Sequence, residues 1–140
     1  MATAVSDRTT FDRIWDGVWH SRNARQVITD HYADAFAMHI SSLSRPIDRG
    51  TFIDFVAGWQ RAFPDGRMEI RDVIGDGNCL WCYWLSTGTH QADYLGVPAT
   101  GRRVAYEGVD IYRFAGDRIA ECWAVPDVLT LLRQLGVVPG

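Results

Sequence analysis

Apolar residues recur at helical spacing through the first half of the chain, which predicts amphipathic helices packed on a core through one face. A first helix follows an N-cap at Thr9 or Thr10, and a second follows a cap at Asn23. A third starts at Asp48 or Thr51 and stops at the Pro-Asp-Gly of residues 64–66. The apolar face of the first helix is Phe11, Ile14, Trp15, Val18 and Trp19, and that of the third is Phe52, Phe55, Val56, Trp59 and Phe63.

The remainder of the chain has the pattern of β-strands. Strands are predicted at residues 37–40, 67–74, 79–90, 103–114 and 118–125, and a polar loop at residues 41–50. Gly-Asp-Gly-Asn at residues 75–78 is a strong turn signal, so the strands on either side should form a hairpin. Met68, Ile70 and Ile74 are expected to share one face of their strand. A short apolar helix is predicted after Pro126, closed by Gly136.

The strand at residues 79–90 is apolar on both faces. Leu80, Cys82 and Trp84 alternate with Trp81, Tyr83 and Leu85. A strand of this kind is usually covered on both sides. We therefore expect helices on one side and a second copy of the chain on the other, which gives a homodimer through the sheet face.

Helices followed by a run of antiparallel hairpins predict one α+β domain over residues 1–140, with the helices packed on one face of a mostly antiparallel sheet. Six Trp, five Tyr and six Phe are plentiful for this length. They either pack a core or shape a pocket for a flat, apolar ligand, and a fold with a cavity needs both.

Charge and hydropathy exclude several classes of partner. The net charge of −3 provides no basic surface, so we expect no nucleic-acid partner. No apolar run is long enough to span a membrane, and the first residues lack the pattern of a signal peptide. We therefore expect a cytoplasmic protein that does not bind membranes.

The sequence contains no motif of a known metal or cofactor site. Cys79 and Cys82 have the spacing of redox and zinc sites, but residues three apart in a strand point to opposite faces. A phosphate-binding glycine loop, a nucleophile elbow, a zinc-binding His-Glu-x-x-His and a dinucleotide fingerprint are all missing. We therefore expect no metal and no cofactor, which leaves acid–base chemistry by carboxylates and imidazoles.

Four residues are candidates for this chemistry, and each has a structural alternative. His90 could transfer a proton or could fix the loop at residues 86–101. Asp110 could line a pocket together with Tyr106, or it could belong to the exposed face of its strand. His39 could face the pocket or lie at its rim. Asp127 precedes the last helix, and its spacing alone favours an N-cap.

Several motifs resemble those of the SnoaL-like polyketide cyclases. They are Gly88-Thr89-His90, the Gly-Val-Pro-Ala-Thr-Gly-Arg of residues 96–102, the Asp-Arg-Ile-Ala-Glu-Cys-Trp of residues 117–123, Asp127 at the usual distance after Trp123, the Phe-Pro-Asp of residues 63–65, and Gln134-Leu135-Gly136 with Pro139. The family has the nuclear transport factor 2 or ketosteroid isomerase fold. The resemblance therefore implies a curved sheet that forms a cone, with a deep pocket at its open mouth.

The resemblance also implies a reaction, the intramolecular aldol closure of a ring in an aromatic polyketide of secondary metabolism or antibiotic biosynthesis. It assigns Asp127 as the general acid/base, with a pKa raised by burial against Trp123 and neighbouring aromatic residues. His90 would orient the substrate or relay a proton. The residues expected to contact a small, apolar, polycyclic substrate are Trp15, His39, Trp59, Trp84, Tyr106, Asp110 and Trp123.

Other functions on the same fold stay open. A cofactor-independent hydroxylase and an isomerase are possible, although two oxyanion donors of the isomerase type cannot be assigned. Epoxide hydrolysis needs an aspartate–arginine–aspartate group, and residues 103–114 contain no Arg-x-Asp step. A non-catalytic module that binds a small ligand would need no acid in the pocket.

Overall fold

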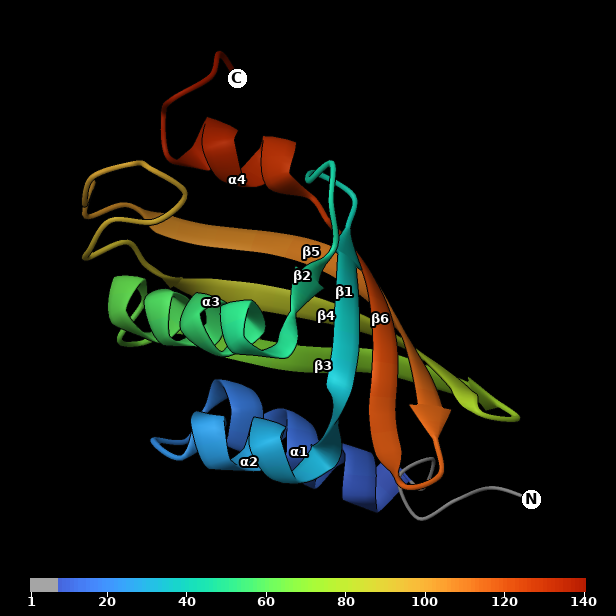
Figure 1. The fold of residues 1–140 in the computed structure, drawn as a ribbon. Coiled ribbons are helices and arrows are strands. Elements are labelled where there is room, and N and C mark those ends of the chain that lie inside the picture. The colour runs from blue at the N-terminus through green and yellow to red at the C-terminus, as the bar shows by residue number, and fades with distance from the viewer. Residues whose placement is uncertain (1–7) are drawn as a thin grey trace.

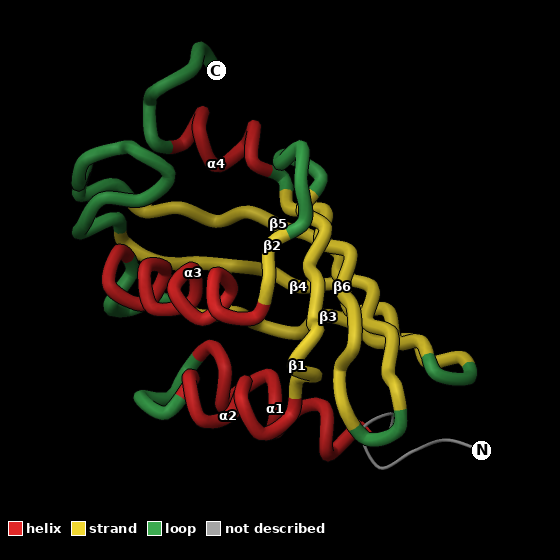
Figure 2. Tube along the Cα trace, in the orientation of Figure 1, coloured by secondary structure: helices red, strands yellow, loops and turns green. Residues whose placement is uncertain are grey.

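The structure is a computed structural model that describes residues 8–140. Within these residues, the helices are α1 (Arg8–Trp19), α2 (Ala24–His31), α3 (Arg49–Ala62) and α4 (Val128–Gln134). The strands are β1 (Tyr32–Ile40), β2 (Ile47–Asp48), β3 (Arg67–Asp76), β4 (Cys79–Thr89), β5 (Arg103–Ala115) and β6 (Arg118–Pro126) (Figure 1; Figure 2). No helix in this part of the chain is long and apolar enough to cross a membrane.

The strands form one curved sheet in the order β2-β1-β6-β5-β4-β3. All neighbours are antiparallel except β1 and β6, which run parallel. Helices α1, α2 and α3 pack on the same side of the sheet, and α4 lies at one end of it (Figure 1). The predicted α+β class, with a mostly antiparallel curved sheet and helices on one face, is confirmed.

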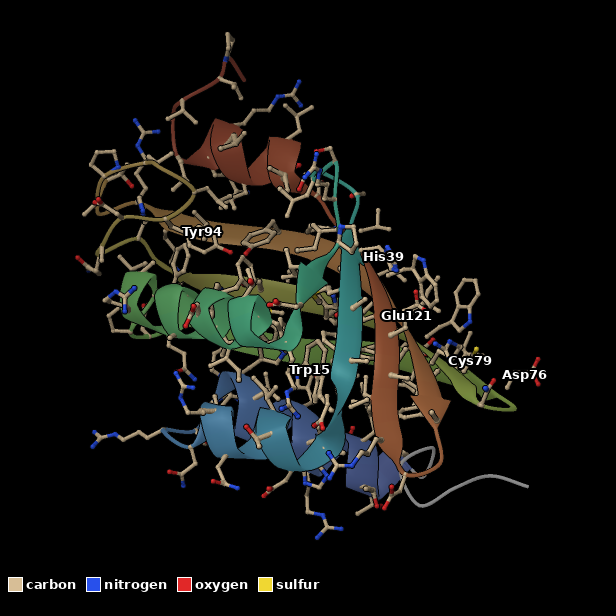
Figure 3. The ribbon with its side chains drawn as sticks, viewed as in Figure 1. Trp15, His39, Asp76, Cys79, Tyr94 and Glu121 are labelled. Atoms are coloured by element: carbon tan, nitrogen blue, oxygen red, sulfur yellow. The ribbon has the colours of Figure 1, made fainter. Side chains whose placement is uncertain are left out.

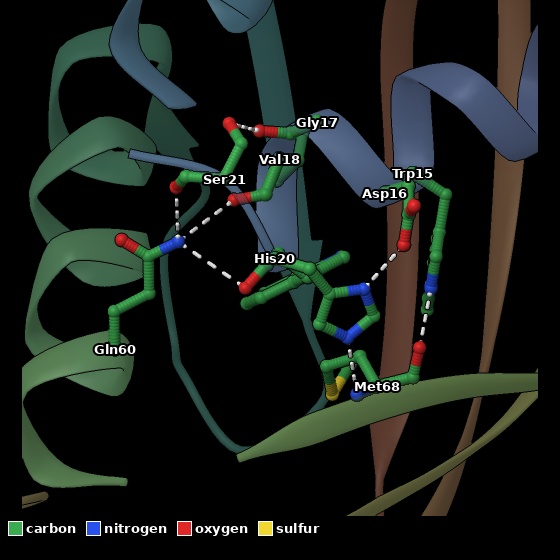
Figure 4. Close-up of polar contacts among 9 residues, drawn as sticks. Trp15, Asp16, Gly17, Val18, His20, Ser21, Gln60 and Met68 are labelled. Atoms are coloured by element: carbon green, nitrogen blue, oxygen red, sulfur yellow. Dashed lines mark hydrogen bonds and ion pairs between the residues drawn. The ribbon is translucent and has the colours of Figure 1, made fainter. Parts of the chain in front are cut away.

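Side-chain hydrogen bonds fix the end of α1 against α3 and β3 (Figure 4). The amide Nε2 of Gln60 donates to the backbone oxygens of Val18, Trp19 and Ser21 over 3.0–3.3 Å. The Met68 backbone N–H donates to Nε2 of His20 over 2.9 Å, and the Met68 carbonyl accepts from the Trp15 indole over 2.8 Å. These bonds satisfy polar atoms where helices and sheet meet, and they set the position of α1 over β3.

Several predicted element boundaries are corrected by the structure. Helix α1 already includes Arg8, so neither Thr9 nor Thr10 is its N-cap. The strand predicted at residues 37–40 begins at Tyr32, and the predicted loop contains β2, where Ile47 pairs with Met38. Such short pairings depend on the partner strand and have no local pattern of their own. Asp48 is confirmed as a helix start, since its Oδ1 accepts from the Thr51 N–H over 2.8 Å.

A register shift in β3 overturns one predicted face. Ile70 pairs with Trp84, but Asp72 pairs with Tyr83, so the alternation of side chains changes between Ile70 and Asp72. Met68 is buried as expected, whereas Ile74 is 66% exposed on the outer face, where it pairs with Trp81. An extra residue of this kind flips every side chain that follows it.

The two faces of β4 are those predicted from the sequence. Leu80, Cys82 and Trp84 are buried beneath the helices, while Trp81 and Tyr83 are exposed on the outer face. Cys79 lies at the β3–β4 hairpin end of its strand (Figure 3), and Cys82 is fully buried on the inner face. The two thiols of the C-x-x-C pattern therefore belong to opposite faces of the sheet.

Candidate active site

A cavity of about 210 Å³ lies between the inner face of the sheet and helices α3 and α4. Its walls are mostly apolar and include Met38, Phe55, Trp59, Met68, Trp84 and Leu131. Among the described residues that line it, Asp110 is the one carboxylate. A concave apolar site with few convergent polar groups is typical of a small-molecule pocket.

Asp110 is held by two hydrogen bonds inside this apolar wall. The Trp84 indole donates to its Oδ1 over 3.0 Å, and the Tyr112 hydroxyl donates to its Oδ2 over 2.8 Å. The residue is only 3% exposed. Burial raises the pKa of Asp110 to about 6, and the hydrogen bonds from Trp84 and Tyr112 limit the rise. A carboxyl group with this pKa can both accept and donate a proton near neutral pH.

The strand alternation of β5 brings Asp110 to the cavity. Val104, Tyr106, Gly108, Asp110 and Tyr112 all point inward and are buried. The alternative face, with Ala105, Val109 and Ile111, points outward. The sequence left these two arrangements open, and the structure selects the first.

Asp127 lies outside the cavity and caps α4. Its Oδ1 accepts from the Thr130 N–H over 3.1 Å, and its Oδ2 accepts from the Thr130 hydroxyl over 2.6 Å. The side chain is exposed, and the hydrogen bonds from Thr130 lower the pKa of Asp127. The expected burial and raised pKa are therefore wrong, because α4 begins at the surface and its N-terminus stabilises an ionised carboxylate.

His90 is fully buried one residue beyond β4 and anchors the loop that follows. Its Nδ1 accepts from the Thr100 N–H over 3.2 Å and lies 2.9 Å from the Thr100 hydroxyl oxygen. Backbone bonds to Gly101 and Arg102 close the same loop. The ring does not line the cavity, so its contacts are those of the structural alternative considered from the sequence.

Three of the predicted substrate-contacting residues lie away from the cavity. His39 and Trp123 pair across β1 and β6 and stack on the outer face, with ring centroids 5.3 Å apart. His39 Nε2 also lies 2.6 Å from Glu121 Oε2, on the same side of the sheet (Figure 3). Trp15 belongs to the core between α1 and β3. Trp59, Trp84, Tyr106 and Asp110 do line the cavity.

Tyr94 is a cavity residue that the sequence analysis missed. It lies in the β4–β5 loop, where a single β-bridge pairs it with Val97, and it is buried against Phe55 and Phe63. The available signal was an aromatic residue within a polar, glycine-rich loop. Local periodicity cannot detect a loop residue that reaches back into the core.

Among residues 8–140, no group of three or more His, Cys, Asp or Glu side chains is placed to hold a metal ion. The buried thiols closest in register to Asp110 are Cys82, which pairs with it directly, and Cys122, which pairs with Tyr112. Burial and the charge of Asp110 raise the pKa of both thiols. They are therefore neutral groups around the carboxyl.

The fold and the site together define a small α+β protein with an apolar cavity and one buried carboxyl group inside it. The sequence profile of the SnoaL-like polyketide cyclases matches residues 9–135. The chain belongs to this family. No curated protein matches it in sequence.

Several solved structures have a similar fold. A "putative SnoaL-like polyketide cyclase" from Jannaschia sp. CCS1 has a TM-score of 0.86 and 20% identity, covering 99% of this chain and 99% of that one. A "putative polyketide cyclase" from Acidithiobacillus ferrooxidans has a TM-score of 0.79 and 26% identity, covering 97% and 98%. AclR from Streptomyces galilaeus, described as a "putative hydroxylase", has a TM-score of 0.82 and 23% identity, covering 97% and 100%.

Proposed function

We propose that the protein is a cofactor-free cyclase that closes a ring in a small polyketide-like substrate by an intramolecular aldol reaction, with Asp110 as the general acid/base. The single observation that carries the proposal is the buried carboxyl of Asp110 in the wall of an apolar cavity, bonded by Trp84 and Tyr112. Membership of the SnoaL-like polyketide cyclases supports the substrate class.

The proposed reaction uses one proton twice. The Asp110 carboxylate removes a proton from a carbon that lies between two carbonyl groups, and the substrate becomes an enolate. The enolate carbon then bonds to the carbon of a further carbonyl group, the tethered ketone, in the same molecule. The electron pair of that C=O bond moves to its oxygen, which takes the proton back from Asp110. The product has the mass of the substrate, and the conjugated carbonyls of the substrate stabilise the enolate.

Asp110 takes the role that the family resemblance suggested for Asp127. A proton-transfer residue needs access to the substrate and a pKa near neutrality, and the two carboxyl groups differ in both. Asp110 faces the cavity and its pKa is raised toward neutrality, whereas Asp127 is in solvent and its pKa is lowered. The contribution we propose for His90 is to hold the loop that carries Tyr94, through Thr100.

The test uses a bicyclic aromatic β-keto ester with a second, tethered ketone as substrate. The wild-type protein should convert it into a cyclic product of unchanged mass. Asp110→Asn should fold and bind the substrate, but turn it over about 10²–10⁴-fold more slowly, since Asn cannot transfer a proton. Asp72→Asn is a matched control, because Asp72 is exposed on β3.

Three results would reject this function. Near-normal turnover by a folded Asp110→Asn protein would show that another group moves the proton. A product heavier by one oxygen atom would indicate a hydroxylase instead. Substrate binding without any conversion by the wild type would indicate a ligand-binding module.

We also propose that the protein is a cytoplasmic homodimer, assembled through the outer face of the sheet. Ile74, Trp81, Tyr83, Val109 and Val125 are exposed on strands β3 to β6. Trp81 of β4 lies directly opposite Ile74 of β3, so the apolar side chains of these two residues are neighbours. A large apolar patch of this kind is uncommon on a monomer.

A further inference from the structure

Three hydrogen-bond donors belong to residues that line the cavity. They are the Trp59 indole of α3, the Tyr94 hydroxyl of the β4–β5 loop and the Tyr106 hydroxyl of β5. Figure 3 shows Tyr94 between this loop and α3. Its ring packs edge-on to Phe63 at 5.2 Å between centroids, so the loop residue is held in the core. None of the three donors has a part in the proposed proton transfer.

These donors lie at a fixed separation from Asp110. Tyr106 and Asp110 share the inner face of β5 and are four residues apart, which is roughly 13 Å along a strand. The Trp84 ring lies between them. It packs edge-on to Tyr106 at 5.9 Å, covers Gly108, and donates its hydrogen bond to Asp110. The cavity floor thus has two polar positions separated by one flat aromatic ring.

Two polar atoms in and beside this donor group are poorly satisfied by the protein itself. Within the described residues, Trp59 Nε1 and Ser86 Oγ are buried and make no hydrogen bond of good geometry, although both lie near the Tyr106 hydroxyl. Buried polar atoms are nearly always bonded, so the exceptions require an explanation. Ser86 lies opposite Tyr106 in the register of β4 and β5. Ser86 Oγ and Trp59 Nε1 therefore both lie in the surroundings of the Tyr106 hydroxyl.

The two tyrosines are donors at neutral pH. Burial raises the pKa of Tyr94 and of Tyr106 above the ordinary value, so both hydroxyls keep their protons. Ser86, Tyr94 and Trp59 approach the Tyr106 oxygen closely enough to limit the rise in its pKa. Neutral hydrogen-bond donors gathered around one oxygen in this way can also bind an oxygen of a substrate.

We propose that Trp59, Tyr94 and Tyr106 form a subsite that binds a carbonyl or enolate oxygen of the substrate, at the other end of the Trp84 ring from Asp110. The substrate class is then a polycyclic ketone whose bound oxygen lies at the opposite end of the ring system from the carbon that loses its proton. This inference rests on the proposed function for the identity of the cavity as the substrate site. It adds the position of a second recognition point and assigns three residues to it.

The probe is α-tetralone, a bicyclic ketone, compared with tetralin, the hydrocarbon of the same ring skeleton. Binding is measured by quenching of tryptophan fluorescence, since Trp59 and Trp84 line the cavity. The environment of the bound carbonyl is measured by its infrared stretching frequency. The wild type should bind the ketone more tightly than the hydrocarbon, and the stretch should lie below its value in hexane, because donors weaken the C=O bond.

The variants are Tyr106→Phe and Tyr94→Phe, which keep the ring and remove the hydroxyl, with Trp59→Phe as a further member of the set. Each hydroxyl deletion should weaken α-tetralone binding about three- to tenfold, the range for one hydrogen bond, and leave tetralin binding unchanged. The carbonyl stretch should move toward its value in hexane. Tyr83→Phe is the matched control, since it removes an exposed tyrosine hydroxyl from the outer face of β4.

The outcomes separate the two proposals. If α-tetralone and tetralin bind equally and the stretch matches that in hexane, the donor subsite is rejected, while the role of Asp110 is still decided by the turnover of Asp110→Asn. If all three cavity variants bind α-tetralone as the wild type does, the subsite is also rejected. If neither probe binds at all, the cavity is not a ligand site and both proposals fail.

Discussion

The Trp84 indole donates a hydrogen bond of 3.0 Å to Oδ1 of Asp110, although 26 residues separate the two in the chain. They lie on neighbouring strands, β4 and β5, and the residue opposite Trp84 in the register is Gly108. A Cβ atom at Gly108 would lie 2.2 Å from Trp84 Cζ2. The glycine thus leaves the space in which the indole turns along β5 and reaches the carboxyl.

Gly108→Ala should displace Trp84 and disturb the carboxyl. Overpacking of a buried position typically costs about 1–3 kcal/mol of the free energy of unfolding, and we expect a loss at least in this range. Turnover should fall as well, since Asp110 loses its donor. Urea unfolding and steady-state kinetics measure the two effects. Gly75→Ala is the control, because the nearest atom to its new Cβ would be 3.9 Å away. Equal stability of the two variants would contradict the packing described here.

The pH dependence of stability should contain a contribution from Asp110 with a defined sign. Its pKa in the folded protein is about 6, above the ordinary value of 3.8, so the folded state binds the proton more tightly than the unfolded state. Stability from this group is complete below about pH 4 and is lost as the pH rises through about 6. The shift corresponds to about 3 kcal/mol at most. The Asp110→Asn protein has no carboxyl to ionise, so it should keep its folding stability as the pH rises and should be more stable than wild type near pH 7.

The check is chemical unfolding of wild type and Asp110→Asn at several pH values. The difference between the two proteins isolates Asp110 from the other carboxyl groups. It should grow between about pH 4 and pH 7. A difference that stays constant over this interval would mean that the carboxyl has an ordinary pKa in the folded protein. The kcat/KM of the wild type should show a transition near the same pH, because the base must be ionised to accept a proton.

Asp127 should behave as a helix cap and not as a catalytic group. Asp127→Asn should keep both stability and turnover, because asparagine caps a helix about as well as aspartate. Asp127→Ala should lower the melting temperature slightly, since Thr130 loses its acceptor, and should leave turnover of the folded protein intact. A folded Asp127→Asn protein with turnover reduced by about 10²-fold or more would restore the role implied by the family resemblance.

The outer face should associate two copies of the chain. Sedimentation of the wild type at micromolar concentration should give twice the mass of one chain. Trp81→Glu places a charge in the centre of the exposed apolar patch and should produce monomers. Val137→Glu is the matched control, since Val137 is an exposed apolar residue after α4. A monomeric wild type, or a Trp81→Glu protein that remains dimeric, would show that this face is not the interface.

The sequence alone determined the features that depend on neighbours in the chain. The stripe from Phe11 to Trp19 defined a helix, because positions three and four apart share a helical face. Asp48 was predictable as a cap, since its side chain bonds a backbone N–H three residues later. The alternation of side chains in β5 already placed Tyr106 and Asp110 on the same face of the strand, but it did not decide whether that face is the inner or the outer one. The turn at residues 75–78 joined β3 to β4 for the same local reason.

Only the tertiary structure decided which of these faces meets the cavity. Burial beneath the helices raises the pKa of Asp110, and Trp84 and Tyr112 hold its carboxyl there, whereas Asp127 is exposed at the start of α4 and hydrogen bonds from Thr130 lower its pKa. The register shift after Ile70 turned Ile74 outward, and the packing of a loop against Phe63 brought Tyr94 inward. Solvation and contacts between distant segments set these outcomes, since burial of a side chain depends on elements that no local pattern contains.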